Sequence, residues 1–247
     1  MESIPVSNAA PTALPWIVQP HGNLEPVDDG LWTVDGTIHM PIGAFPRRMS
    51  VVRLEGGRLL IWSAIAIDDA TLTELESLGR PAYLVVPGDH HRADALAWKL
   101  RFPDVQVAAP PGSAEKVQQE VGVDTRTPHF TDPTVRCDVV AGTREHEFAL
   151  LIRRASGTTL VVNDIIANIR HVRGFSGWLL KRMGFAGDEP HVPAPIRAML
   201  IREKAALREQ LLTWSALSDL RRIVVSHGDV ITHDPQGALR LLAEALA

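Results

Sequence analysis

The sequence predicts a layered α/β fold of the α+β kind, an αββα sandwich in which two mixed β-sheets flanked by helices pack face to face. Two observations support this fold class. Predicted β-hairpins lie near the start and near the middle of the chain, and segments that alternate between helix and strand follow each of them. Such alternation over short connections is typical of a sheet covered by helices. Two halves of this kind are expected to pack sheet on sheet.

The first half of the chain contains the elements of one predicted sheet. Four prolines among the first 20 residues favour an extended N-terminal arm over residues 1–25, because proline donates no backbone hydrogen bond. Gly56-Gly57 joins two short apolar runs, which predicts a hairpin. The predicted strands are 31–34, 49–54, 58–62, 82–86 and 105–109, and the predicted helices are 68–78, 93–102 and 112–121.

The second half begins with another hairpin, whose strands are 149–152 and 158–162. A long helical pattern covers 194–212, a last strand covers 223–226, and Asp234-Pro235 opens a C-terminal helix.

Residues from about 165 to 215 are interpreted as a cap or insert segment. Its part from 169 to 185 mixes basic side chains with large apolar ones. We favour a cap over the core or the mouth of the site. The alternative interpretation is an amphipathic element that lies on a membrane surface or on a partner.

Composition excludes several classes of protein. The chain has 247 residues, ten histidines, one cysteine and a net charge of −4 at pH 7. At about 150 residues per domain, we interpret 1–247 as a single domain. One cysteine excludes an internal disulfide and a Cys-rich zinc site, and the mildly acidic charge argues against a nucleic-acid binder. No secretory signal and no run of about 18 apolar residues is found, so a cytoplasmic location without a membrane span is expected.

Ionisable side chains follow three predicted strands at the point where each strand ends. The segments are Asp89-His90-His91 after 82–86, Asp164 after 158–162, and His227 after 223–225. A rigid strand end can aim a metal ligand while the following loop stays open to substrate. Imidazoles combined with a carboxylate suit zinc, iron or manganese. Each residue alone also has a structural interpretation, as a surface histidine, a helix N-cap or a turn residue.

The order of these elements resembles the metallo-β-lactamase fold superfamily. There a strand leads to H-x-H-x-D-H at a helix start, a G-H-T segment precedes a hairpin that ends in G-D, and the last strand ends in H-G. The corresponding segments here are LVVPGDHHRADALAWKLRFPDVQVAAP, AGTREHEFALLI, TTLVVNDII and IVVSHGD, within about residues 31–232. The resemblance is to a branch of the superfamily in which the long motif is degenerate.

The resemblance also implies which metal site is kept. In the superfamily, three histidines bind one metal, while an aspartate, a histidine, a bridging aspartate and the final histidine bind another. With His91 on the last histidine of the motif, Val86, Gly88 and Thr143 occupy the three histidine positions of the first site. The positions of the second site are occupied by His90, His91, Asp164 and His227. The first site is therefore expected to be lost and the second to be retained.

The resulting hypothesis is a hydrolase of a small-molecule substrate with one divalent metal, zinc first and iron or manganese as alternatives. His91, Asp164 and His227 are the expected ligands, and His90 is a fourth ligand or a nearby acid–base group. Three protein ligands and a water would lower the pKa of that water toward ~7 and supply a nucleophile.

Two further residues and one alternative function complete the hypothesis. Glu145 or His146 would replace the lost hairpin ligand, or act as a base or as a support for a ligand. The alternative is a non-catalytic binding protein on a degenerate fold that has lost its metal. The substrate is undetermined by the sequence, and a homodimer stays open.

Overall fold

The computed structural model describes residues 16–40, 43–170 and 174–247. The first of its two sheets has the strand order β1-β2-β3-β4-β5-β6. Strands β1 to β4 pair antiparallel, whereas β5 and β6 run parallel to β4. The bounds of these strands are His21–Asp28 (β1), Leu31–Met40 (β2), Gly43–Leu54 (β3), Arg58–Trp62 (β4), Arg80–Val85 (β5) and Gln106–Ala108 (β6).

The second sheet has the strand order β10-β9-β8-β7, in which β10 pairs parallel with β9 and the other pairs are antiparallel. Its strands are Val135–Val139 (β7), Phe148–Arg154 (β8), Gly157–Val162 (β9) and Leu220–Val225 (β10). The helices are Asp69–Leu78 (α1), Ala95–Arg101 (α2), Ala114–Gln118 (α3), Gly174–Arg182 (α4), Ala194–Met199 (α5), Lys204–Ser215 (α6) and Pro235–Glu244 (α7).

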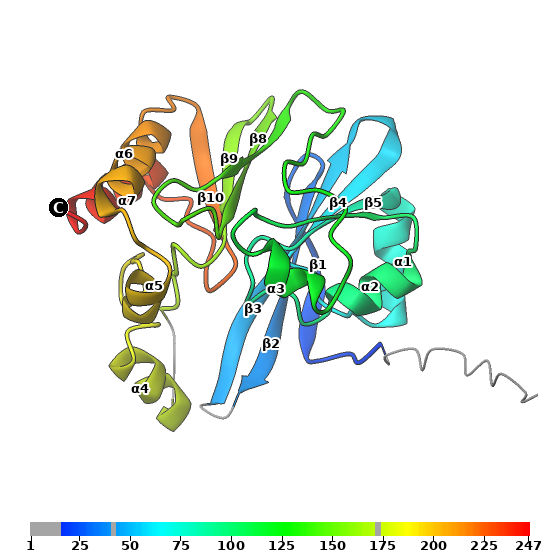
Figure 1. The fold of residues 1–247 in the computed structure, drawn as a ribbon, viewed down its shortest axis with the longest axis horizontal. Helices are drawn as coiled ribbons and strands as arrows, with labels where there is room; N and C mark the ends of the chain where they lie inside the picture. Colours follow the sequence, from blue (N-terminus) through cyan, green and yellow to red (C-terminus); the bar gives the residue numbers. More distant parts are fainter. Residues whose placement is uncertain (1–15, 41–42, 171–173) are drawn as a thin grey trace, which may run out of the picture.

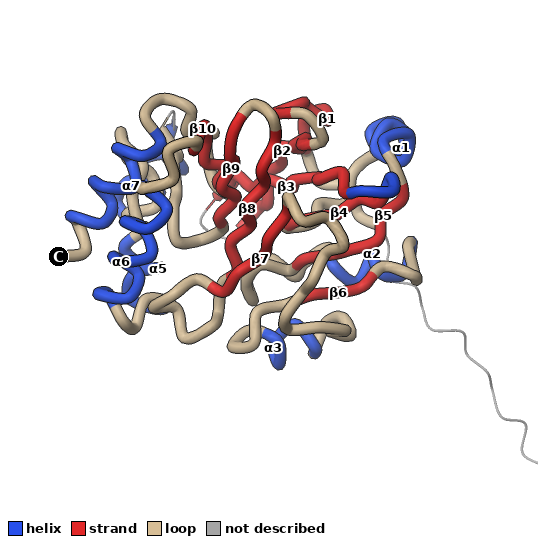
Figure 2. The backbone as a smooth tube through the Cα atoms, turned by 90° about the horizontal axis from the view of Figure 1, so that it is seen from above, coloured by secondary structure: helices blue, strands red, loops and turns tan. Residues whose placement is uncertain are grey.

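The two sheets face each other, and helices cover the outer side of each. In Figure 1, α1 and α2 lie outside the first sheet and α6 and α7 outside the second, and Figure 2 gives the same order of layers from above. One buried cluster lies between the first sheet and α1 to α3, a second between the sheets, and a third under α6 and α7. The predicted αββα class is confirmed.

Strand β8 shows why its sequence suits this position between two cores. Phe148, Leu150 and Ile152 pack between the sheets, whereas Ala149 and Leu151 pack under α6 and α7. Successive side chains of a strand point to opposite faces of the sheet. Because both faces of β8 are buried, its sequence is a continuous apolar run, with no alternation of apolar and polar residues.

The prediction and the structure differ in four elements, the N-terminal arm, β2, β3 and β7. Residues 21–25, assigned to the N-terminal arm, form the start of edge strand β1, and residues 1–15 of that arm lie outside the described residues. Strands β2 and β3 extend well beyond the predicted 31–34 and 49–54. Strand β7 was absent from the prediction, although its sequence VRCDV has the period-two pattern of a strand.

The predicted helix 194–212 is wrong, because two helices occupy this region. Helix α5 ends at Met199 and α6 begins at Lys204. Between them, the backbone N–H groups of Arg202 and Glu203 both donate to the carbonyl of Gly142, and the side chain of Ile201 is buried. These tertiary contacts bend the chain where local propensity favours a continuous helix.

The segment 165–215, predicted as a cap or insert, also includes helix α6. Leu207, Leu211 and Trp214 of α6 are buried in the cluster under α6 and α7, so this helix belongs to the outer layer. Helices α4 and α5 lie apart from that layer, below the ends of β9 and β10 in Figure 1. The described part of the chain contains no helix long and apolar enough to cross a membrane.

A partly buried ion pair joins the two sheets. Asp28 at the end of β1 accepts hydrogen bonds from Arg222 in β10 and from Ser156 in the turn before β9. Burial raises the pKa of Asp28, but hydrogen bonds from Ser156, the Asp29 amide and Arg222 outweigh it and lower that pKa below 3.8. The ionised carboxylate therefore stabilises the folded state.

Replacing Asp28 by asparagine is expected to lower the free energy of unfolding at pH 7 by about 1–3 kcal/mol. Because the folded-state pKa is lowered, the stabilisation is present above pH 3.8 and is lost as the pH falls through the folded-state pKa. Urea unfolding between pH 7 and pH 3 should show a difference between the two proteins that is largest at pH 7 and becomes smaller as the pH falls below 3.8. Asp29→Asn is the control, because the Asp29 side chain is exposed and pairs with the exposed Arg53. Equal stabilities of Asp28→Asn and wild type at pH 7 would contradict the prediction.

Candidate metal centre

The candidate ligands come from the ends of three strands. Asp164 follows β9 by two residues and His227 follows β10 by two residues. Because β9 and β10 are parallel neighbours with Val162 paired to Val225, their carboxyl ends lie at the same edge of the second sheet. His91 lies on the loop after β5 of the first sheet. The two sheets together therefore bring the three side chains to one place.

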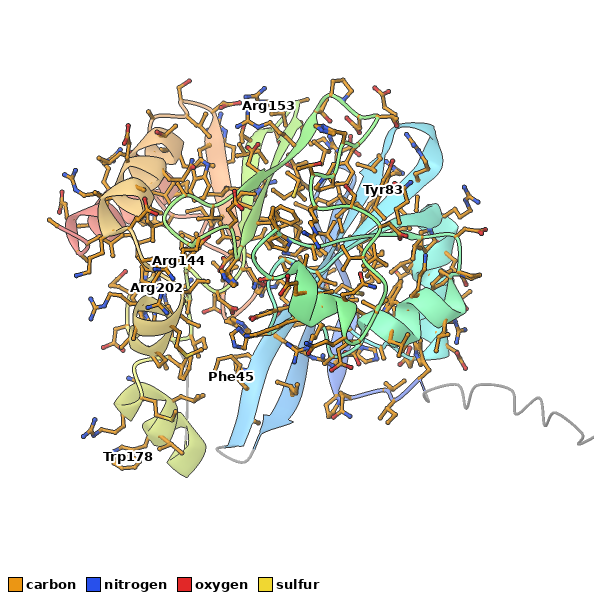
Figure 3. All side chains as sticks on the ribbon, viewed as in Figure 1. Phe45, Tyr83, Arg144, Arg153, Trp178 and Arg202 are labelled. Atoms are coloured by element: carbon orange, nitrogen blue, oxygen red, sulfur yellow. The ribbon has the colours of Figure 1, made fainter. Side chains whose placement is uncertain are left out.

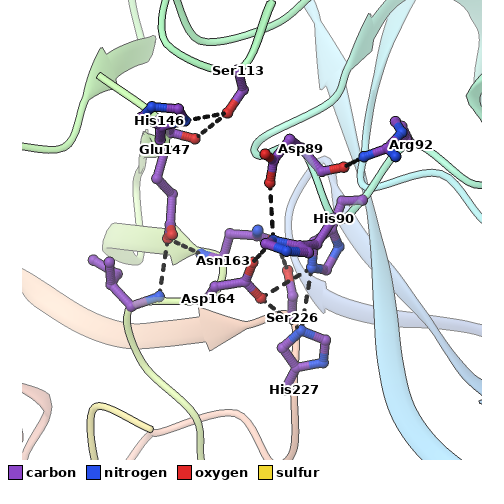
Figure 4. A network of polar contacts seen from close by, with 12 residues as sticks. Asp89, His90, Arg92, Ser113, His146, Glu147, Asn163, Asp164, Ser226 and His227 are labelled. Carbon is purple, nitrogen blue, oxygen red and sulfur yellow. Dashed lines mark hydrogen bonds and ion pairs between the residues drawn. The ribbon is translucent and has the colours of Figure 1, made fainter. Parts of the chain in front are cut away.

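Three side-chain atoms converge there. His91 Nε2 lies 3.2 Å from Asp164 Oδ1, His227 Nε2 lies 3.0 Å from the same oxygen, and the two nitrogens are 3.2 Å apart. In the described part of the chain, these three residues form a group of side chains close enough together to hold a metal ion. Their side chains are only 8%, 8% and 11% exposed. Figure 4 shows His227 and Asp164 pointing toward each other.

The hydrogen bonds of His227 indicate that this cluster needs a cation. Its Nδ1 lies 2.7 Å from the carbonyl oxygen of Pro46, which can only accept, so Nδ1 carries the proton. In a neutral ring, Nε2 then presents a lone pair to the Asp164 carboxylate. Two acceptors at 3.0 Å repel each other unless a second proton or a metal ion lies between them.

The geometry of the cluster fits a small divalent metal. Ligand bonds of about 2.0–2.1 Å in a tetrahedral arrangement place neighbouring ligand atoms about 3.3 Å apart. The observed separations of 3.0 to 3.2 Å are close to this value. Ligating histidines commonly use their second nitrogen for a hydrogen bond that orients the ring. His227 does so with Pro46, and His91 Nδ1 lies 2.6 Å from Ser63 Oγ.

The ionisation states also suit a metal. Burial lowers the pKa of His91 and so favours the neutral ring, whose lone pair can bind a metal. Burial alone would raise the pKa of Asp164, but without a metal the attraction of a protonated His91 and hydrogen bonds from protonated His227 and His91 outweigh it. The pKa of Asp164 therefore lies well below its usual range, and the group is a carboxylate.

His90 lies beside the cluster and does not join it. Its Nδ1 is 2.9 Å from Asp89 Oδ1 and 3.8 Å from Asp164 Oδ2, and its side chain is 54% exposed. The hydrogen bond with Asp89 raises the pKa of His90 despite partial burial, and the Asp164 carboxylate adds to the effect. Of the two roles predicted for His90, this geometry favours the acid–base role over that of a fourth ligand.

The other two predicted residues lie farther from the cluster. The side chain of Glu145 is exposed and borders neither of the cavities described below. The half-buried His146 has its Nδ1 3.4 Å from Ser113 Oγ and lines one cavity wall. Neither side chain belongs to the converging group.

Glu147 was absent from the sequence prediction, although it directly follows the two predicted residues Glu145 and His146. Its Oε1 accepts hydrogen bonds from the backbone N–H groups of Asn163 and Ile165, on both sides of Asp164. Burial and the nearby Asp164 carboxylate raise the pKa of Glu147 well above its ordinary value. Figure 4 shows this carboxyl group beside the loop of Asp164, with dashed lines to the backbone on both sides of that residue. Glu147 therefore holds the loop that carries Asp164.

One serine and one glycine, Ser63 and Gly228, also help to position the ligands. Ser63 follows β4 with a left-handed backbone at φ 54°, which brings its hydroxyl to His91. Gly228 has φ +100°, and a Cβ there would lie 2.1 Å from the carbonyl oxygen of Asn168. Glycine directly after His227 is thus required by the close approach of the two loops. Sequence analysis missed Ser63, although it is a polar residue directly after a predicted strand, as the candidate ligands are.

The three positions assigned to the lost metal site have no ligand group that faces the cluster. Val86 is buried in the core under α1 and α2, and Gly88 has no side chain. The hydroxyl of the buried Thr143 donates to the carbonyl of Val140. These residues therefore leave room beside Asp164 without offering ligands.

Two cavities adjoin the cluster. One has a volume of about 260 Å³ and an apolar wall made mainly of Phe45, Phe185, Ile196 and Met199, with His227 at its base. The other has a volume of about 240 Å³, and basic, acidic and apolar side chains line it together. His90 and Asp164 border both cavities. A small molecule in either cavity would contact the candidate metal centre.

Comparisons with solved structures identify the fold. No family model and no curated protein matches the chain. Its structure is similar to that of TMB-1, with a TM-score of 0.61, 14% identity, and coverage of 90% of this chain and 97% of that one. It is similar to the metallo-β-lactamase FIM-1 from Pseudomonas aeruginosa in its mono-zinc form, with a TM-score of 0.60, 12% identity, and coverage of 94% and 98%. A metallo-β-lactamase from Erythrobacter litoralis aligns with a TM-score of 0.58, 16% identity, and coverage of 90% and 96%.

These matches extend over nearly the whole of each chain. The protein therefore has the metallo-β-lactamase fold, as its sequence motifs predicted. At identities of 12 to 16% the likeness concerns the fold and not the reaction.

Proposed function

We propose that the protein is a metal-dependent hydrolase of a small molecule, with one divalent metal held by His91, Asp164 and His227. Zinc is the first expectation, and iron or manganese are alternatives. The observation that carries the proposal is the convergence of two Nε2 atoms and one carboxylate oxygen within 3.2 Å of one another. The mono-zinc form of FIM-1, on the same fold, is consistent with a single metal.

The residues around the cluster have distinct roles in this proposal. A divalent metal held there would act as a Lewis acid and make water a stronger nucleophile at neutral pH. Asp89 holds the His90 ring by a 2.9 Å contact to Nδ1, and the raised pKa of His90 favours the protonated ring to higher pH than in a free histidine. His90 can deliver that proton to the leaving group, because it borders both cavities. Ser63, Pro46 and Glu147 orient the ligands.

The alternative is a binding protein that has lost its metal. This alternative would be favoured if the side chains of His91, Asp164 and His227 pointed apart or were packed behind apolar groups. Instead, the three side chains converge and border a cavity. These observations favour the enzyme. A β-lactam substrate does not follow from the fold, because pocket shape sets substrate choice.

Metal analysis of the untagged protein, purified without chelator, tests the proposal. We expect about one equivalent of zinc, iron or manganese per chain. Esters, thioesters, lactones and phosphodiesters should then be screened for hydrolysis with each metal added. Chelation should abolish any turnover found, and the metal should restore it. A metal-free protein that takes up none of the three metals would refute the proposal.

A further inference from the structure

The cavity of about 240 Å³ beside the metal centre, here called the basic cavity, is built largely by residues that the proposed chemistry leaves unused. Its wall includes Gly88 and Thr143, where the lost metal site would lie. Lys116 of α3, Arg144 of the turn before β8 and Arg202 between α5 and α6 also line it. Three separate segments thus bring cationic side chains to one cavity that reaches Asp164.

Two of these cations are not neutralised. The side chain of Arg144 makes no hydrogen bond or ion pair with any described residue. The guanidinium of Arg202 donates to the carbonyl of Ala198 and forms no ion pair in the same part of the chain. Figure 3 shows both side chains in the same region, between α5 and the turn before β8. The two guanidinium groups therefore keep most of their donors available.

The carboxylates around the basic cavity already have partners. Asp89 lies 2.6 Å from Lys116 Nζ and 2.9 Å from His90. Glu147 Oε1 accepts two backbone hydrogen bonds, and Asp164 contacts both cluster histidines. None of them pairs with Arg144 or Arg202. The uncompensated charge on the cavity wall is positive.

The backbone holds both arginines in place. Arg144 and Glu145 have left-handed conformations, with φ of 50° and 63°. Such conformations cost about 1 kcal/mol or more for residues other than glycine, and they persist where surrounding contacts impose them. The Glu145 carbonyl accepts from the Gly112 N–H, and the Gly142 carbonyl accepts from the N–H groups of Arg202 and Glu203. The contact that interrupts the predicted helix therefore also sets the backbone position of Arg202, whose exposed side chain lines the same cavity as that of Arg144.

We propose that the basic cavity binds an anionic group of the substrate, a carboxylate or a phosphate, through Arg144 and Arg202. Guanidinium groups bind both anions by paired hydrogen bonds. An anion held there would place the rest of the molecule over the metal centre, since Asp164 and His90 border the same cavity. This assignment of the substrate class rests on the proposed hydrolase function.

Anion binding can be tested without turnover. Chelator-treated protein would be titrated calorimetrically with inorganic phosphate and with succinate at constant ionic strength. The double variant Arg144→Gln/Arg202→Gln should bind at least one of these anions about 10-fold more weakly than wild type does. The matched control is Arg208→Gln, because Arg208 is exposed on α6 and does not line the cavity. Equal affinities in the double variant, or no binding of either anion by wild type, would overturn the proposal.

A pair of ester substrates tests the link to catalysis. One ester carries a terminal carboxylate, and its partner carries the methyl ester of that group. In wild type, kcat/KM should be higher for the charged ester, and the ratio of the two should fall about 10-fold in the double variant. An unchanged ratio would overturn the assignment. Anion binding without any hydrolysis would instead leave the basic cavity supported and count against the hydrolase.

Discussion

Replacing any one of His91, Asp164 and His227 is expected to weaken metal binding by more than about 100-fold, because loss of residues that only orient a ligand already costs 10- to 100-fold. The variants are His91→Ala, Asp164→Asn and His227→Ala. Each removes one of the three atoms that lie within 3.2 Å of one another. After dialysis, metal content should fall from about one equivalent per chain to nearly none.

Two further measurements separate loss of metal from loss of fold. Metal that binds only the native state raises its melting temperature. Added zinc should therefore stabilise wild type and leave the three variants unchanged, while circular dichroism shows that they remain folded. His129→Ala is the matched control, since His129 is exposed and lies outside the cluster. A full equivalent of metal retained by His91→Ala or His227→Ala would rule out the assigned ligands.

Replacing His90 by glutamine is expected to lower kcat about 10²- to 10⁴-fold, the usual contribution of a positioned acid–base group. Metal content should stay at the wild-type level, because His90 lies outside the converging atoms. This combination distinguishes an acid–base residue from a fourth ligand. Glu145→Gln is the control, because the Glu145 side chain is exposed and borders neither cavity.

The pH profile gives a second readout for His90. Its pKa is raised above 6.5, chiefly by the hydrogen bond with Asp89, so the protonated ring persists to higher pH than in a free histidine. Wild-type kcat should decline as the pH rises through this raised pKa, and the decline should be absent in the variant. If His90→Gln loses its metal together with its activity, His90 is a ligand and this assignment is wrong.

Much of the architecture could be predicted because it depends on local patterns. Strand β4 matches its predicted bounds, and α1 starts after the Asp68 N-cap and ends before Gly79. Alternation, capping and turn residues act within a few positions of one another, so a single sequence contains them. The strand ends that carry Asp164 and His227 were located in the same way.

The break between α5 and α6 could not be predicted from local patterns. The residues that interrupt the helix, Arg202 and Glu203, donate to Gly142, about sixty positions earlier in the chain. The same long-range contact builds the basic cavity, so sequence analysis missed both features together. Glu147 was missed for a similar reason, since its partners are the backbone amides on either side of Asp164.

The sequence by itself determined the residue types at three strand ends and the layered fold that brings those ends together. Only the tertiary structure decided which of these residues converge. His91 and His227 are 136 positions apart, and their ring orientations depend on Ser63, directly after β4, and on Pro46 in β3. Adjacent His90 is held by Asp89 beside the cluster and does not join it. Neighbours in sequence were separated, and distant residues joined, because hydrogen bonds to other segments of the chain set the direction of each ring.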